Sequence, residues 1–325
     1  MKKIIIYFLA VLLVTVMIDV LFSFATEKAI SSGKVYSLFE NKSISTDIAI
    51  IGASRAVRHY NPQIFSKRMD CGVKVFGKTN RGVIFHYAIL KTMLNSTITP
   101  PKIVLLEVAE TDINIRTDLT YEEELSVLYP FYYSEPAVRE VLDDVLDKKE
   151  LFMMKYSSLY RNNSKIIPYF VSLFKGRASS LLYGYLPLYN VWTKPIAVKK
   201  ENVKVDPVKI RYMNNVFELC KQNKIKLVVL MSPSYRILQG EKWKEKIKAM
   251  AVEYNIPVID YEQDSTFLAH QEWFNDSYHL NKVGSDIYSN RIVDELGLLL
   301  NGGVEYREGK LNHGLVSNPT DDKLN

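Results

Sequence analysis

Short apolar strand-like runs alternate with helical stretches along most of the chain, and this alternation constrains the fold more than any other feature. The strand candidates are residues 46–51, 73–76, 102–108, 225–234 and 256–262. Residues 225–231, IKLVVLM, are almost continuously apolar, which is typical of strands buried on both faces of a sheet. Strands that alternate with helices form parallel sheets, with functional groups at the carboxyl ends. The sequence therefore predicts an α/β fold with a parallel, doubly wound sheet.

The helices expected between and after these strands are residues 82–95, 206–224, 241–255 and 281–300. Asp206 is a suitable cap for the second of them, because Pro207 follows it at the first helical position. Composition then divides the chain into segments. They are an N-terminal apolar segment (1–25), a connector (26–44), two halves of the α/β domain (45–116 and 206–300), an insertion (117–205) and a polar tail (301–325).

The insertion is rich in tyrosine and phenylalanine and shows helical periodicity without clear strands. We expect it to cover the carboxyl ends of the strands. It is either a lid that binds substrate or an extra packing layer without a ligand.

The N-terminal segment has the length and composition of a membrane anchor. Residues 4–24, IIIYFLAVLLVTVMIDVLFSF, form an apolar run of about the 20 residues that cross a bilayer. Lys2 and Lys3 precede it, which predicts a cytoplasmic N-terminus and a body outside the inner membrane of a bacterium. Ser23-Phe24-Ala25 resembles a signal-peptidase site, but the run exceeds the roughly 7–15 residues of a signal-peptide core. We therefore expect an uncleaved, single-pass anchor.

Composition excludes several classes of function. A chain of 325 residues with 47% hydrophobic residues can bury a large core. Its net charge of +6 comes from scattered basic residues, so nucleic-acid binding is not expected. Two cysteines, Cys71 and Cys220, exclude a disulfide framework, and we expect two buried free thiols. No metal is expected, because the histidines lack ligand spacing. We expect His59 to be a structural or surface residue and Glu107 to be an acid in a loop.

A serine and a histidine at opposite ends of the domain form the candidate catalytic pair. Ser54 follows the first strand directly, and Asp276 lies three residues before His279 at the start of the last helix. A serine hydroxyl needs an adjacent base, and the base needs a third group that fixes its tautomer. The alternatives are structural: Ser54 and Asp276 are both suitable helix caps.

These two segments resemble the first and last sequence blocks of the SGNH (GDSL-type) hydrolases. The matching stretches are IIGASR (50–55), with Ala53 where the family usually has an aspartate, and NDSYHLN (275–281). The stretches LSVLYPFYY, GYLPLYNVW and MSPSY also resemble membrane-anchored SGNH-like proteins of Bacteroides-type bacteria. The resemblance implies a flavodoxin-like three-layer α/β/α sandwich. It also implies ester hydrolysis or acyl transfer, often on cell-envelope glycans, without metal or organic cofactor.

Carried over to this chain, the resemblance makes Ser54 the nucleophile, His279 the base and Asp276 its orienting acid. The backbone N–H groups of Ser54 and Gly77, in VFGKTN, would form the oxyanion hole.

The family's third block, which supplies an asparagine donor, is where this chain departs from the pattern. The corresponding stretch is LLEVAETDIN, with Glu110 nearest that position. An ionised carboxylate cannot donate a hydrogen bond to an oxyanion. Either Asn80 or Asn114 replaces it, or catalysis is slow or lost. Arg55 is a further candidate for substrate contact, although a structural salt bridge is its commoner role.

Three functional hypotheses follow. The first is an extracytoplasmic, membrane-anchored serine esterase or O-acyltransferase that acts on acylated, most simply O-acetylated, envelope glycans. The second is a non-catalytic SGNH-like module that binds a glycan or an envelope-protein partner during polysaccharide modification or export. The third is a lipase or phospholipase.

Overall fold

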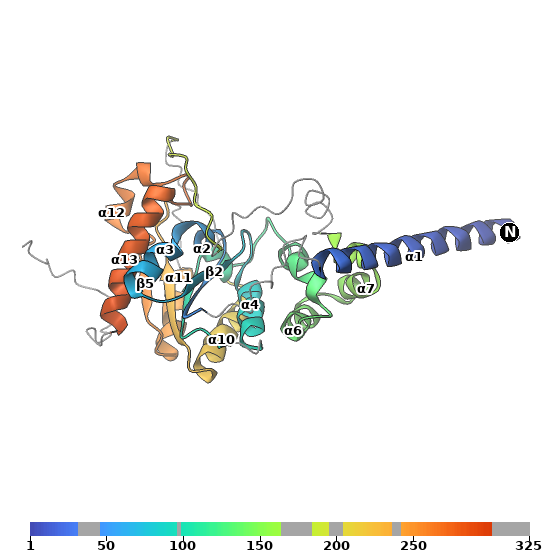
Figure 1. Ribbon diagram of the computed structural model, residues 1–325, viewed down its shortest axis with the longest axis horizontal. Helices are drawn as coiled ribbons and strands as arrows, with labels where there is room; N and C mark the ends of the chain where they lie inside the picture. Colours follow the sequence, from blue (N-terminus) through green and yellow to red (C-terminus); the bar gives the residue numbers. More distant parts are fainter. Residues whose placement is uncertain (32–45, 96–98, 164–183, 195–203, 236–241, 301–325) are drawn as a thin grey trace, which may run out of the picture.

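The computed structural model describes residues 1–31, 46–95, 99–163, 184–194, 204–235 and 242–300 (Figure 1). Five parallel strands form one sheet in the order β2-β1-β3-β4-β5. The strands are β1 (Ile48–Gly52), β2 (Val73–Gly77), β3 (Ile103–Glu107), β4 (Lys226–Met231) and β5 (Val258–Asp260). This is the flavodoxin-like order, in which the chain changes direction across the sheet at β1 and β3. The predicted parallel α/β fold is confirmed.

Helices cover both faces of the sheet because each central strand is apolar on both sides. Ala49 and Ile51 of β1 face one core, together with α4 (Val83–Asn95), α10 (Pro207–Gln222) and α11 (Lys242–Glu253). Ile48 and Ile50 face the other core. The helices of that second face are α2 (Ser54–His59), α3 (Pro62–Met69) and α13 (Lys282–Leu300). The three-layer α/β/α sandwich is therefore built from the period-two alternation of buried strand residues.

The helix starts follow the expected capping chemistry. The Asp206 side chain accepts hydrogen bonds from the N–H groups of Val208 and Lys209, as its place before Pro207 predicts. Asn281 caps α13 in the same way through the N–H groups of Val283 and Gly284. Asp264 caps the short α12 (Ser265–Leu268), which precedes the 3₁₀ turn η4 (Gln271–Trp273).

The described part of the insertion is helical up to Asn163 and irregular over residues 184–194. Its elements are η1 (Glu110–Asp112) just before it, then α5 (Tyr121–Leu125), η2 (Ser126–Phe131), α6 (Pro136–Val145), α7 (Lys148–Tyr156) and α8 (Ser158–Arg161). Helix α6 packs on α4, and α6 and α7 lie on the side of the body from which α1 projects (Figure 1). Residues 164–183 and 195–203 lie outside the described residues.

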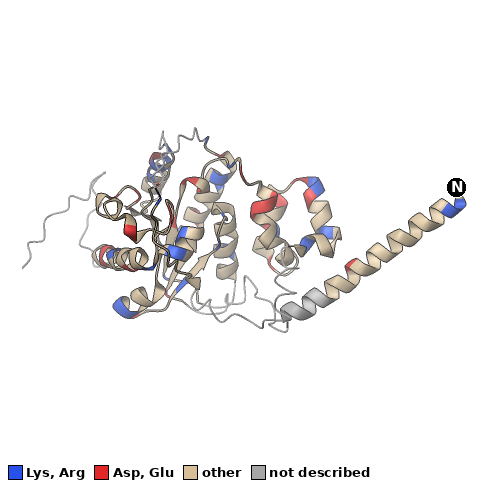
Figure 2. Cartoon of the chain, turned by 90° about the horizontal axis from the view of Figure 1, so that it is seen from above, with Lys and Arg blue, Asp and Glu red and all other residues tan. Residues whose placement is uncertain are grey.

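The N-terminal helix α1 (Lys2–Ser31) extends beyond the expected boundary at residue 25. Its segment Lys2–Phe24 is long and apolar enough to cross a membrane, and none of that stretch is buried against the body. Figure 2 shows basic residues at the N-terminal end of α1. Asp19 is the one Asp or Glu residue in the apolar segment Lys2–Phe24. A membrane anchor and a signal sequence share these properties. The remaining connector and the tail at 301–325 lie outside the described residues.

The two cysteines are free thiols. Cys220 of α10 is buried, as expected, whereas Cys71 is only half-buried in the turn before β2.

Gly52 allows α2 to fold back closely over the end of β1. A Cβ atom at this position would lie 2.9 Å from the Cβ atoms of Ala56 and Glu107 and from the carbonyl oxygen of Glu107. Two of these three atoms belong to the neighbouring strand β3, so they cannot move away without distorting the sheet. The glycine is required by close packing of the first strand-to-helix turn.

We therefore expect Gly52→Ala to lower the free energy of unfolding by about 1–3 kcal/mol, because the added methyl overpacks the turn. Gly297→Ala is the matched control, since a Cβ at that position in α13 meets nothing within 4 Å. In the control, the substitution should raise the free energy of unfolding by roughly 0.5–1 kcal/mol, because alanine favours a helix more than glycine does. Urea unfolding of the full chain in one detergent, followed by circular dichroism, measures both. Equal effects in the two variants would contradict the packing argument.

Candidate active site

Ser54, His279 and Asp276 meet at the carboxyl edge of the sheet. Ser54 is the first residue of α2, and the other two lie in the loop before α13. Ser54 Oγ is 2.8 Å from His279 Nε2. His279 Nδ1 is 3.1 Å from each carboxylate oxygen of Asp276. The structure thus brings together the three side chains that sequence reasoning paired across 225 positions.

These contacts define the protonation pattern that nucleophilic catalysis needs. A carboxylate only accepts hydrogen bonds, so Nδ1 of His279 carries the proton and donates to Asp276. Nε2 is then an acceptor for the hydroxyl proton of Ser54. In this tautomer, His279 is placed to remove the proton of Ser54 as Oγ attacks an electrophile.

The loop that carries Asp276 and His279 is held by its own main chain. Asn275 N donates to the His279 carbonyl at 2.8 Å, and Phe274 and Leu280 form an antiparallel bridge across the base of the loop. Asp276 Oδ1 accepts from the N–H groups of Tyr278 and His279. Asp276 therefore caps the local turn and also orients the imidazole. The two roles considered for this residue, a structural cap and the acid that orients His279, are compatible.

The charge of Asp276 is stabilised by these contacts. Burial alone would raise the pKa of its carboxyl, but the hydrogen bond and charge of His279, the Tyr278 N–H and the Asn275 amide outweigh burial. Together they lower the pKa of Asp276 from 3.8 to about 2. Asp276 is thus ionised at neutral pH and can stabilise an imidazolium.

The exposed fraction rises from Ser54 through His279 to Asp276. Ser54 is 7% exposed, whereas the side chains of His279 and Asp276 are 22% and 43% exposed. The hydroxyl is therefore recessed, and the imidazole borders solvent, which gives a substrate a direction of approach.

A buried ion pair lies directly beside the candidate nucleophile. Arg55 follows Ser54 and is 1% exposed, with its Nε 2.9 Å from Glu107 Oε1 at the end of β3. Its other nitrogens donate to the carbonyls of Val108 and Ser232 at 2.7 and 3.2 Å. Burial alone would lower the pKa of Arg55, but the negative charge of Glu107 foremost raises it well above its usual value. Arg55 is therefore a buried structural cation, in place of the substrate contact that was also considered.

His59 joins the same network from the end of α2. Its Nε2 accepts the N–H of Leu280 at 3.0 Å, which leaves the proton on Nδ1. Nδ1 therefore donates to Ser232 Oγ at 2.7 Å, and Ser232 Oγ donates to Glu107 Oε1 at 2.7 Å. Burial first, and then the nearby charge of His279, lower the pKa of His59 well below its usual value. His59 is neutral, and its ring centroid lies 6.1 Å from that of His279.

Sequence reasoning treated Glu107 as a loop acid and His59 as structural or surface, and it missed Ser232. Glu107 instead ends a buried strand and binds Arg55, Ser232 and the hydroxyl of Tyr60. The charge of Glu107 could have indicated the contact with Arg55. An acid at the end of the apolar strand KIVLLE needs a buried partner, and Arg55 follows a neighbouring strand.

The predicted oxyanion residues lie on two adjacent strands. Gly77 ends β2 in register with Gly52 at the end of β1. A Cβ at Gly77 would lie 2.7 Å from Val57 Cγ2 and 2.9 Å from the Gly52 carbonyl, so this residue packs against the turn that presents Ser54. The N–H of Ser54 is in the first turn of α2, where no carbonyl of the helix is in position to accept it.

The residue nearest the third donor position, Glu110, and its two possible replacements have different environments. Asn80 is exposed in a turn with φ of 59°, and its carbonyl accepts from Arg81. Asn114 is buried, forms a bridge with Val205, and its carbonyl accepts from Lys209 Nζ at 3.1 Å. Glu110 is 3% exposed in η1, and its charge acts on Arg55 and Glu262. Glu110 thus belongs to the acids that surround the buried arginine.

Within the described residues, no three His, Cys, Asp or Glu side chains are placed to hold a metal ion. The arrangement of Ser54, His279 and Asp276 can support acyl transfer by a serine nucleophile.

No protein-family model matches this chain, and no curated protein sequence matches it. Among solved structures, it is similar to the acetyl xylan esterase AlAXEase, with 12% identity, a TM-score of 0.40, and coverage of 78% of this chain and 99% of that one. A family two carbohydrate esterase from Clostridium thermocellum, solved with cellohexaose, has 8% identity and a TM-score of 0.40 over 79% of this chain and 65% of that one.

A lipase/acylhydrolase from Enterococcus faecalis has 12% identity and a TM-score of 0.34 over 77% of this chain and 94% of that one. Likeness at this level carries no inference about activity. The candidate site therefore stands on its own geometry.

The lowered pKa of Asp276 makes a testable contribution to stability. A depressed carboxyl pKa stabilises the folded chain above the unfolded value of 3.8, and this contribution is lost as pH falls toward 2. Asp276→Asn lacks the contribution at every pH. The difference in free energy of unfolding between the native chain and this variant should therefore narrow between pH 4 and pH 2, as measured by urea unfolding.

Ser54→Ala keeps the Asp276–His279 pair, so it should follow the pH dependence of the native chain. If the difference in free energy of unfolding between Asp276→Asn and the native chain stays constant from pH 4 to pH 2, the lowered pKa of Asp276 is contradicted.

Proposed function

We propose that this protein is a serine esterase of the SGNH type that cleaves acyl esters on carbohydrates. The observation that carries the proposal is the 2.8 Å contact between Ser54 Oγ and His279 Nε2, with Nδ1 held by Asp276. Ser54 Oγ attacks the ester carbonyl while His279 takes its proton. In the proposed mechanism the N–H groups of Ser54 and Gly77 stabilise the oxyanion. His279 then protonates the departing sugar oxygen, which leaves the acyl group on Ser54.

The second half of the reaction releases the acyl group. Water, deprotonated by His279, attacks the acyl-enzyme and gives a free acid in an esterase, and His279 returns the proton to Ser54 Oγ as the acyl bond breaks. A sugar hydroxyl in place of water gives an O-acyltransferase. Both outcomes use the same triad, so the acceptor decides between them, and we propose O-acetylated glycans as the simplest substrates.

A segment of the insertion supports a carbohydrate substrate. Residues 184–194 are tied to both catalytic segments, because Leu186 N donates to the Val57 carbonyl in α2 and Lys282 N donates to the Leu188 carbonyl. Directly after the second of these hydrogen bonds lies Tyr189, which is 75% exposed. An exposed aromatic ring held near an acyl-transfer site offers an apolar face to the C–H groups of a sugar.

The apolar segment of α1 supports a location at a membrane. We propose that α1 is an uncleaved anchor in the bacterial inner membrane, with Lys2 and Lys3 on the cytoplasmic side and the catalytic body outside. The finer resemblance to Bacteroides-type membrane proteins is part of this proposal. The substrates would then be glycans of the cell envelope.

Ser54→Ala should abolish covalent labelling of the full chain by a fluorophosphonate and lower kcat on an acetylated sugar by at least about 10³-fold. The reason is that the alanine lacks the atom that forms the acyl-enzyme. Ser134→Ala, which changes an exposed serine far from the triad in sequence, is the control and should keep full labelling. Labelling that persists in Ser54→Ala would disprove the nucleophile.

A native chain that resists labelling while folded would favour the alternative of a non-catalytic glycan-binding module. Mass analysis of the products, with and without an acceptor sugar, separates hydrolysis from transfer. Acetate release that does not respond to any acceptor would identify an esterase.

Tyr189→Ala should raise KM for an acetylated oligosaccharide by roughly fivefold with kcat nearly unchanged, since a stacking contact of about 1 kcal/mol binds ground and transition states alike. Tyr156→Ala is a matched control, because Tyr156 of α7 is also 75% exposed. The same assay with an acetylated small alcohol, which cannot stack, should show no effect of either variant. A KM change on both substrates, or in both variants, would argue against a sugar platform.

A further inference from the structure

Helix α7 presents an apolar surface that the rest of the described body leaves uncovered. Phe152, Met153 and Tyr156 are 59%, 39% and 75% exposed, and the rings of Phe152 and Tyr156 lie 4.8 Å apart. Their spacing places all three on one side of the helix, while Met154 faces inward and is fully buried. We call these three residues the α7 face.

The surroundings of the α7 face carry both signs of charge. Helix α7 begins with the exposed pair Lys148 and Lys149. Lys155 pairs with Asp143 of α6 at 2.9 Å, and the Arg161 guanidinium lies 5.0 Å from the centre of the Tyr133 ring. The nearby acids are turned to other partners: Asp147 caps α7 and Glu150 accepts from Tyr129 and Tyr160. Aromatic side chains bordered by lysine and arginine are typical of helices that lie at a membrane surface.

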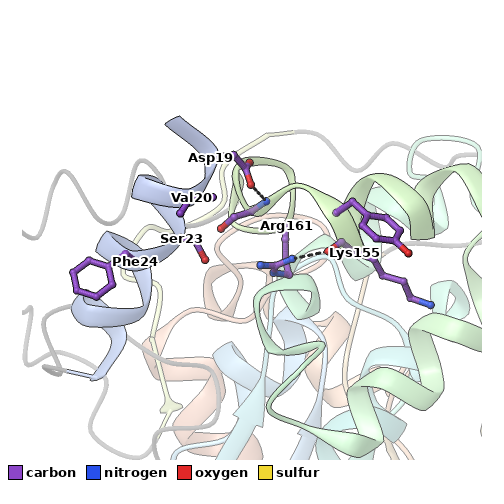
Figure 3. Close-up of a pocket in the computed structure, with 8 residues that line it drawn as sticks. Asp19, Val20, Ser23, Phe24, Lys155 and Arg161 are labelled. Atoms are coloured by element: carbon purple, nitrogen blue, oxygen red, sulfur yellow. Dashed lines mark hydrogen bonds between the residues drawn. The ribbon is translucent and has the colours of Figure 1, made fainter. Parts of the chain in front are cut away.

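Asp19 of α1 sets the position of this surface along the anchor. Its carboxylate accepts hydrogen bonds from the Ser157 hydroxyl and from the N–H groups of Ser158 and Leu159, all at 2.8–2.9 Å. These residues follow α7 directly, so the end of α7 is fixed to α1 at residue 19 (Figure 3).

The position of Asp19 in α1 gives the depth of the end of α7 along the apolar segment. It lies five residues before Phe24, where the apolar segment Lys2–Phe24 ends. At about 1.5 Å per residue, this places the end of α7 roughly 7–8 Å inside the outer end of the apolar segment. Amphipathic helices at membrane surfaces bury their apolar faces by about 5–10 Å. The end of α7 is therefore at the depth that an interfacial helix occupies.

The same region contains a pocket between anchor and body. It has a volume of about 310 Å³ and is lined by Asp19, Val20, Ser23 and Phe24 of α1 and by Lys155, Tyr156, Ser158 and Arg161 (Figure 3). Apolar side chains from α1 and Tyr156 line it together with the two cations. This combination suits a phospholipid, whose acyl chains and phosphate need both kinds of contact.

We propose that α7 and the start of α8 form an interfacial foot, in which the α7 face lies among the phospholipids of the bilayer that α1 crosses. The inference rests on the proposed membrane anchor. In this arrangement the body contacts the bilayer at two places, α1 and α7. Two contacts fix the tilt of the catalytic domain relative to the membrane, whereas an anchor alone would leave it free to swing.

The test uses the full chain in nanodiscs of phosphatidylethanolamine and phosphatidylglycerol, with the fluorophore NBD attached at Phe152→Cys. The half-buried Cys71 is first replaced by serine, and the buried Cys220 is left in place. Spin-labelled lipids quench NBD only where the probe contacts them. The foot requires a blue-shifted emission and loss of most of the fluorescence when these lipids are included.

Two further probes make the result decisive. Val14→Cys in α1 reports whether the anchor is in the bilayer, and Val252→Cys in α11, at a residue that is 64% exposed, reports an ordinary water-exposed surface. Quenching at Val14 with a Phe152 probe that behaves like Val252 would overturn the foot and leave the anchor intact. No quenching at Val14 would remove the anchor and the foot together. A Phe152 probe that is shielded from water but not quenched by lipid would mean that protein covers the α7 face, which also overturns the proposal.

Discussion

The ion pair between Arg55 and Glu107 is the interaction on which the candidate site depends. A guanidinium that is 1% exposed is tolerated only when carboxylates and carbonyls surround it, and these come from the ends of β3 and β4 and from Glu262, just after β5. Arg55 thus joins α2 to three neighbouring strand ends. Because Ser54 is the adjacent residue, the position of the candidate nucleophile follows from the packing of a buried charge.

The strands, most helices and the triad could be predicted from the sequence because each leaves a local pattern. Buried strands are continuously apolar, Asp206 and Pro207 mark a helix start, and parallel topology brings the ends of strands to one edge. Ser54 and His279 could be paired because their flanking residues form recognisable blocks. The network of Glu107, Ser232 and His59 could not, since its members are 48 to 173 positions apart and no local pattern marks their contacts.

Helix α1 illustrates the same limit at a single residue. From the sequence, Asp19 is the one ionisable residue in an apolar run, and its position near the C-terminal end of that run predicts only that water is within reach. The structure shows a specific use, because Asp19 accepts three hydrogen bonds from the residues that begin α8. Such a contact requires a chain segment about 140 residues away, which hydropathy alone does not reveal.

The arrangement of His59 has a consequence for where a proton can travel. Both ring nitrogens are committed, one to the Leu280 N–H and the other to Ser232, although the ring lies near His279. If His279 takes the proton of Ser54 as proposed, His59 has no free ring nitrogen with which to pass that proton toward the core. The proton would then stay on the solvent side of His279, where the proposed leaving sugar oxygen can accept it. The inner histidine would thus close the inward route of proton transfer.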